Sequence, residues 1–496
     1  MSFTAIPRHA VDLPIFSSPF SVLPHILSAD KMPFGAAFPE SIFILMLCYW
    51  PLVAGLRRLP SIPTELWASI LDLVLSDRME SFASYNAGVA ILCSCSPEWD
   101  FFIKDSVRFW TQFNLTCRSS VSEVEAQVFY VSRKTCPIDI NILFDIDDPR
   151  TPTFQYSGLI DEDALARNLV IVTSCLVAVI PTVARWRRVR LSSTTDCFMA
   201  TILRIFRDVP APNMLSLLLY CPAYRAERSC DPLFMTPPRL FAGTMPSLAY
   251  LHLWNTTLPW GDSDYFGSIH AMEFGDAPGD AWPTAESLTA SLVASATLTY
   301  LKFGGGGVML PDKIDIPSFS LPVLQSITIL HWSECDTILR FLAYGAYPIL
   351  HHMTFTHLDD TAWTAVFATG LLRQLRSITI SGWVTDLRHM DQLLRSIDRV
   401  RCIDIRGAHP QVYFAALASQ PSLCPNLCHL SVGNVVLTNM LEYLARRADT
   451  DLTRLREVDY HHHLEHMGPE TASLLSDIRA VVSEFNFIPS LEEDED

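Results

Sequence analysis

A short pattern of apolar and polar positions recurs along the second half of the chain. Leu298, Leu301 and Phe303 form its first regular copy, in which polar residues fill the positions between the apolar ones. Further copies begin at residues 324, 350, 375, 400, 427 and 455, so that successive copies are 25 to 28 residues apart. A fixed period of this size predicts a solenoid, because a single unit of this length cannot bury its own apolar face.

Each copy predicts one strand, and the segments between copies predict helices. The second half of the pattern alternates apolar and polar residues, which is typical of a short strand with one buried face. An ordinary α/β domain also alternates strands and helices, but it does not keep so regular a period. Helical patterns separate the copies at residues 335–344, 361–369, 390–397, 412–419 and 438–447.

The repeated phrase resembles a leucine-rich repeat. This resemblance implies an α/β solenoid with a parallel concave sheet and convex helices. Looser copies begin at Trp186, Met214, Leu248 and Ile269, so we expect ten to twelve units. The predicted solenoid spans residues 130–485, with a strand at 136–142, a helix at 161–180 and helices at 284–296 and 471–485. Residues 486–496 form an acidic tail.

The first 57 residues form an N-terminal extension. Residues 1–37 show no period, and we expect poor order there. Residues 42–56 are free of charge and precede Arg57 and Arg58. This segment is shorter than a typical membrane-spanning helix and contains Pro51. Three interpretations stay open: a buried helix, a membrane-associated anchor, or a segment without structure.

Residues 58–115 predict a small helical unit. Ser61 or Thr64 can cap a helix that has Pro63 near its first turn and Glu65 at its positive end. The sequence then runs through aliphatic residues to Trp99 and Trp110. This unit resembles an F-box, whose pattern opens with Leu-Pro-x-Glu-(Leu/Ile) and closes with Val-Cys-x-x-Trp.

Two departures from the F-box pattern weaken the match locally. Ser96 replaces the usual Cys and is followed by Pro97. The middle segment, residues 77–88, is longer and more polar than in the usual F-box pattern. The structural alternative is a helical cap that seals the first repeat. The position directly ahead of a leucine-rich array favours the F-box, since this pairing is typical of F-box receptors, including large fungal sets.

The F-box resemblance implies specific partners. An F-box docks on a Skp-type adaptor and, through it, on a cullin, and the solenoid of such a receptor holds an unknown target protein. The resemblance therefore implies the substrate-recognition subunit of a Skp–cullin–F-box ubiquitin ligase, cytoplasmic or nuclear. The residues expected to contact the adaptor are apolar: Ile62, Pro63, Leu66, Ile70, Leu92 and Trp99.

Composition narrows the functional classes. The net charge of −17 argues against general nucleic-acid binding, for which a basic footprint is expected. The 13 cysteines lack paired zinc spacing, so we expect reduced thiols in an intracellular protein. No phosphate-loop, nucleophile-elbow or zinc-protease motif is present, which predicts a non-enzyme without cofactors. The histidines at 461–463 and 466 are expected to form a polar rim and to bind no metal.

The polar positions within each strand should project from the concave sheet. They change from aromatic, through hydroxyl, to charged along the array, which suits protein recognition better than a plain solvated sheet. The alternative function is a non-ligase scaffold for protein–protein interaction, with membrane association only through residues 42–56. The predicted target-binding residues are Tyr250, His252, Trp254, Tyr300, Lys302, His352, Asp404, Arg406, His429 and Asp459.

Overall fold

The structure is a computed structural model, and the residues it describes belong to one compact unit, Arg78–Asp496. The predicted adaptor-binding residues and the apolar segment 42–56 lie outside the described residues. Described are residues 111–116, 119–144, 162–193, 196–221, 239–261, 263–275, 282–305, 308, 318–330, 335–382, 387–406, 416–420, 422–433, 437–448, 452, 455–462 and 469–489.

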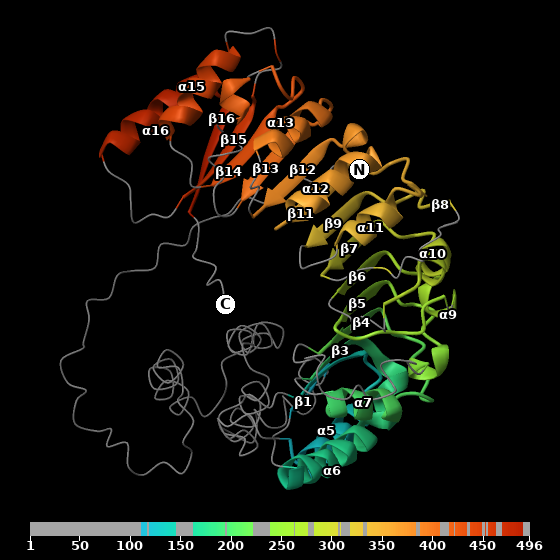
Figure 1. Ribbon diagram of the computed structural model, residues 1–496. Helices are drawn as coiled ribbons and strands as arrows, with labels where there is room; N and C mark the ends of the chain where they lie inside the picture. Colours follow the sequence, from blue (N-terminus) through green and yellow to red (C-terminus); the bar gives the residue numbers. More distant parts are fainter. Residues whose placement is uncertain are drawn as a thin grey trace, which may run out of the picture. The chain divides into compact units, whose positions relative to one another are not determined.

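A parallel sheet of 14 strands runs through this unit. Each strand pairs with the main-sheet strand before it and the one after it in the chain, which is the order expected for a solenoid (Figure 1). The strands are β1 (Gln112–Thr116), β2 (Ile138–Phe144), β3 (Trp186–Ser193), β4 (Ser216–Tyr220), β5 (Tyr250–Trp254), β6 (Ala271–Gly275), β7 (Tyr300–Gly304), β9 (Ser326–Leu330), β11 (His352–Thr356), β12 (Ser377–Ser381), β13 (Cys402–Arg406), β14 (His429–Gly433), β15 (Glu457–His462) and β16 (Glu484–Pro489).

Helices connect the strands and lie along one side of the sheet (Figure 1). Two further strands, β8 (Phe319–Ser320) and β10 (Gly345–Ala346), pair with each other beside the main sheet. The helices of at least eight residues are α5 (Val121–Ser132), α6 (Glu162–Val179), α7 (Asp196–Ile205), α10 (Ala285–Ala294), α11 (Cys335–Leu342), α12 (Asp360–Thr369), α13 (Leu387–Ser396), α15 (Leu437–Ala448) and α16 (Pro469–Val481).

The core lies between the sheet and these helices. The register places equivalent apolar residues of neighbouring repeats beside one another, so that Met353, Ile378 and Ile403 form one buried row. Helix residues such as Leu393 and Tyr443 complete the core from the other side. Because each strand buries alternate residues, the remaining positions face away from the helices.

The predicted α/β architecture with parallel strands in chain order is confirmed. Helices α6, α10, α11, α12, α13 and α15 begin and end within three residues of the predicted boundaries. For the helix predicted at 412–419, only residues 416–419 are described, and they are helical.

The ends of the sheet differ from the prediction. The last helix ends at Val481, and residues 484–489 form β16 instead of continuing the helix to 485. Phe485 and Phe487 then pack against Tyr460 of the preceding strand. At the other end, β1 and α5 precede the predicted start at residue 130, so the sheet extends beyond 130–485 on both sides.

One helical stretch among the described residues, Ala166–Arg185, is long and apolar enough to cross a membrane by length and composition alone. One such helix is weak evidence, because the core helix of a folded domain has the same composition. Val172, Leu176 and Val179 of this stretch are buried in the core, whereas Val170 and Val177 are exposed.

A buried arginine stabilises the connection between the last repeats. Arg447 of α15 is 2% exposed, and its guanidinium donates to the carbonyl oxygens of Cys424, Pro425 and Leu427 at 3.0–3.3 Å. These carbonyls belong to the loop that leads into β14. The Cys424 carbonyl also accepts from the Leu427 N–H at 3.0 Å. A buried carbonyl without a donor costs free energy, so Arg447 adds donors to the carbonyls of this loop.

Replacing Arg447 by Met should lower the free energy of unfolding by about 2–4 kcal/mol, because two buried carbonyls and one partly buried carbonyl lose a charged donor. Denaturant unfolding followed by circular dichroism measures this loss. The matched control is Arg446→Met: the neighbouring Arg446 is exposed and pairs with Glu442 one turn away on the same helix, so about 0.5 kcal/mol is expected. Equal losses in the two variants would contradict the role given to Arg447.

Candidate functional site

The outward side chains of the main sheet form a continuous polar surface, which we call the open face. The parallel register aligns these side chains in rows that run across the strands. From β5 to β16, the first row contains Tyr250, Ala271, Tyr300, Ser326, His352, Ser377, Cys402, His429, Glu457 and Glu484. The second row contains His252, Glu273, Lys302, Thr328, Thr354, Thr379, Asp404, Ser431, Asp459 and Asn486.

All ten residues predicted to bind the target occupy outward strand positions. Eight of them are in these two rows, Trp254 ends β5, and Arg406 ends β13. The alternation within each repeat was sufficient to place them, because side chains of a strand point alternately to its two faces. Their placement leaves their binding role a prediction.

A charged group of three residues crosses β5, β6 and β7. The carboxylate of Glu273 lies 3.2 Å from His252 Nδ1 and 3.0 Å from Lys302 Nζ. The hydrogen bond from His252, together with that from Lys302, lowers the pKa of Glu273 below its ordinary value despite half-burial. Glu273 was not among the predicted site residues, although the degenerate repeat beginning at Ile269 contains it.

Trp254 lies across the open face beside this group. Its ring stacks on His252 with centroids 5.9 Å apart. A Cβ atom at Gly304 would overlap the Trp254 ring, and a Cβ at Gly275 would overlap the Gly304 carbonyl. Gly304, at the end of β7, therefore gives the indole space to lie over this strand, and Gly275, at the end of β6, gives space to the Gly304 backbone. Tyr250, at 57% exposure, extends this aromatic area toward the start of β5.

Hydroxyl groups dominate the centre of the open face. Thr354 and Thr379 are side by side in the second row, and Ser377 is beside His352 in the first. His352 Nε2 lies 3.0 Å from the Thr354 hydroxyl. Burial, with a smaller contribution from His351, lowers the pKa of His352, which favours the neutral ring. The centre therefore offers hydrogen-bonding groups with little charge.

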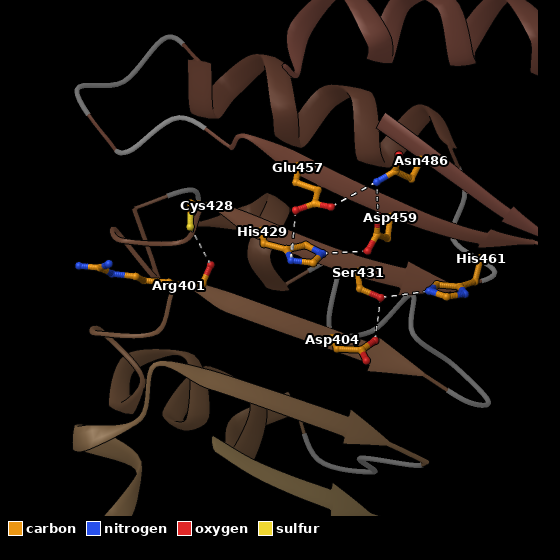
Figure 2. A network of polar contacts seen from close by, with 9 residues as sticks. All are labelled: Arg401, Asp404, Cys428, His429, Ser431, Glu457, Asp459, His461 and Asn486. Carbon is orange, nitrogen blue, oxygen red and sulfur yellow. Dashed lines mark hydrogen bonds and ion pairs between the residues drawn. The ribbon is translucent and has the colours of Figure 1, made fainter. Parts of the chain in front are cut away.

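The far end of the open face holds the most connected group of polar side chains. We call it the C-terminal polar cluster, and it consists of Asp404, His429, Ser431, Glu457, Asp459, His461 and Asn486 (Figure 2).

Two carboxylates converge on one imidazole within this cluster. His429 Nε2 lies 2.9 Å from Asp459 Oδ2, and His429 Nδ1 lies 3.7 Å from Glu457 Oε2. The Asn486 amide donates to the other oxygens, Asp459 Oδ1 at 2.9 Å and Glu457 Oε1 at 3.3 Å (Figure 2). Asn486, from the unpredicted strand β16, therefore orients both carboxylates toward His429.

A second chain of contacts joins the cluster to β13. Ser431 donates to Asp404 Oδ1 at 2.8 Å, and its oxygen lies 3.2 Å from His461 Nε2. Arg406 pairs with the other oxygen of Asp404 at 2.7 Å. His461, predicted as part of a polar rim, is instead a member of this network.

The open face also has a basic end, which the sequence analysis missed. Arg188 and Arg190 project from β3, and both are exposed. Burial raises the pKa of Asp139, but hydrogen bonds from Arg187 and Arg188 outweigh it and leave that pKa below its ordinary value. The loose repeat at Trp186 contained this signal, since Arg188 and Arg190 alternate with the buried Val189.

Metal-ligand geometry is limited among the described residues. His429, Glu457 and Asp459 form the one group of three possible ligands found there, with donor atoms within 4.8 Å of one another. The histidines following His462 lie outside the described residues. Burial raises the pKa of the Cys424 thiol to about 12, which keeps it protonated. No disulfide involves Cys136, Cys175, Cys221, Cys402, Cys424 or Cys428.

Comparisons with known proteins give no family. No protein-family model matches the chain, and no curated protein matches it. Among solved structures, the chain is similar to a Bacteroides fragilis protein, with 12% identity, a TM-score of 0.31, and coverage of 57% of this chain and 67% of that one. It is also similar to the yeast Rad7–Elc1 complex structure, with 13% identity, a TM-score of 0.26, and coverage of 88% and 96%. Similarity this low assigns neither family nor function.

Gly304→Ala should displace the Trp254 ring and lower the free energy of unfolding by about 1–3 kcal/mol through overpacking. The control is Gly433→Ala at the end of β14, where a Cβ would meet its nearest neighbour at 3.6 Å, an ordinary contact. Thermal unfolding and near-ultraviolet circular dichroism measure the two effects. In the Trp254→Ala background, the cost of Gly304→Ala should shrink. An unchanged cost would show that the indole does not need this space.

Glu273→Gln should lower the free energy of unfolding by about 1 kcal/mol at pH 7, because two charge-assisted contacts are lost. A lowered carboxyl pKa means that this contribution is present above the ordinary value of 4.5 and is lost as the pH falls through the folded-state pKa. Denaturant titrations of both proteins between pH 7 and pH 3 test this. A difference that persists undiminished at pH 3 would contradict it.

Proposed function

We propose that this chain is the substrate-recognition subunit of a Skp–cullin–F-box ubiquitin ligase. The observation that carries the proposal is the order of two features along the chain. The first is the F-box-like segment, with its opening phrase at residues 62–66 and its later Trp99, and the second is the long repeat array that follows it. The F-box-like segment would bind the adaptor, and the open face would hold the target protein.

The properties of the open face support a role in recognition. It carries aromatic, hydroxyl and charged side chains in ordered rows, and its residues are part of a rigid ladder of parallel strands. Aromatic side chains such as the exposed Tyr250 and the half-buried Trp254 are of the types that most often anchor a partner. A mixed surface on a rigid repeat scaffold therefore suits the binding of an extended protein segment.

The proposed mechanism is proximity and requires no chemistry from this chain. Binding of the target and of the adaptor to one chain would convert ubiquitin transfer into an effectively intramolecular event. The rate would then depend on the local concentration of target lysines near the charged ubiquitin enzyme.

A scaffold without ligase activity is the second candidate. The same open face favours it, since binding a partner there requires no F-box. The two candidates differ in one respect: only the ligase subunit needs an exposed apolar surface on residues 58–115 for the adaptor.

Wild-type chain should capture a purified Skp-type adaptor, and the double variant Ile62→Asp/Leu66→Asp should lose at least about tenfold in affinity, because charge replaces apolar anchors. The measurement is a pull-down with purified adaptor, with circular dichroism to show that the repeat sheet is intact. The matched control is Tyr250→Asp/Trp254→Asp, which places two charges on the open face and should leave adaptor binding unchanged. Absence of wild-type binding would favour the scaffold.

A further inference from the structure

The C-terminal end of the open face carries an excess of negative charge. Along β13–β16, the outward residues include four carboxylates, namely Asp404, Glu457, Asp459 and Glu484. Among the described outward residues of these strands, Arg406 is the one arginine or lysine, and it pairs with Asp404. Three carboxylates therefore remain without an arginine or lysine partner on this part of the surface.

One imidazole faces two of these carboxylates. His429 Nε2 lies 2.9 Å from Asp459 Oδ2, and His429 Nδ1 lies 3.7 Å from Glu457 Oε2. Asn486 adds neutral donors to the same two carboxylates and holds them in position. The arrangement keeps two negative groups oriented toward one point, and the side chains of Glu457 and Asp459 are 38% and 16% exposed.

The basic residues nearby do not reach this cluster. Arg401 directly precedes β13, and its guanidinium points away from the network (Figure 2). The basic end of the open face, with Arg188 and Arg190 on β3, is nine strands away along the sheet from β14. Within the described part of the chain, no arginine or lysine pairs with Glu457, Asp459 or Glu484, so these carboxylates are available to a cation of another molecule.

We propose that the C-terminal end of the open face binds a lysine- or arginine-bearing extended segment of a partner protein. Charge complementarity favours a basic segment at this end, because the carboxylates of β13–β16 attract it. Arg188 and Arg190 at the opposite end of the same face would repel it. The four strands β13–β16 span roughly 14 Å at about 4.8 Å per strand step, which about four extended residues cover. The hydroxyl-rich centre continues the surface with groups that can bond to a peptide backbone.

This inference rests on the proposed function only in naming the partner: in a ligase subunit, the basic segment would belong to the target. A scaffold could use the same surface. Adaptor capture and peptide binding are separate measurements, so each hypothesis can fail without the other.

The test uses fluorescein-labelled hexalysine and hexaglutamate peptides with the full chain, followed by fluorescence anisotropy in metal-free buffer. Wild-type chain should bind hexalysine at low salt, and 200 mM salt should weaken this binding strongly. The variant Glu457→Gln/Asp459→Asn should reduce affinity about tenfold, because it removes two convergent charges while keeping side-chain shape. Hexaglutamate should not compete with hexalysine.

The control variant removes the same net charge from the helices. Asp391→Asn/Glu442→Gln neutralises two exposed carboxylates on α13 and α15, each paired within its own helix, and should leave hexalysine affinity unchanged. Glu484→Lys, at an exposed position, should weaken binding without disturbing the Asn486 contacts. This third variant keeps the test valid if the double variant is unstable.

Three outcomes would overturn the inference. Failure of wild-type chain to bind hexalysine would do so directly. Equal loss in the helix control would show that overall charge, and not the cluster, attracts the peptide. Stoichiometric binding of Zn²⁺ or Mn²⁺ that displaces hexalysine and disappears in Glu457→Gln/Asp459→Asn would show that the cluster is a metal site instead.

Discussion

The register of the parallel ladder is the constraint on which the rest of this structure depends. Each strand is only about five residues long and cannot be stable alone, so its hydrogen bonds and its apolar side chains must both align with those of its neighbours. A shift of one residue would move Ile378 to the open face and Thr379 into the core. The period of 25 to 28 residues in the sequence reflects this need for alignment.

The same constraint builds the open face. Because the inward positions must be apolar, the outward positions are free to vary, and register brings outward residues of neighbouring repeats into contact. His429 and Asp459 are 30 residues apart in sequence and 2.9 Å apart in the structure. A polar network can therefore develop along the sheet without any change to the core, which is how a repeat scaffold acquires a specific surface.

Sequence reasoning succeeded where periodicity is strong and failed where it is interrupted. The strands from Tyr300 to His462 and their helices follow directly from alternation and spacing. The first strand and β16 lack the full leucine phrase, and Phe485 was assigned to the end of a helix and Phe487 to the acidic tail. The pairing of Asn486 with two carboxylates could not be predicted, since it depends on that missing strand.

The structural role of two glycines could not be predicted from the sequence. Gly275 and Gly304 end adjacent strands, and in sequence each marks only a loop start. In the structure, Gly304 makes room for Trp254 and Gly275 makes room for the Gly304 backbone, so the aromatic area of the open face depends on residues that have no side chain. The aromatic area and the acidic end are thus built differently. Absent side chains shape the first and polar side chains shape the second, while the same ladder of strands carries both.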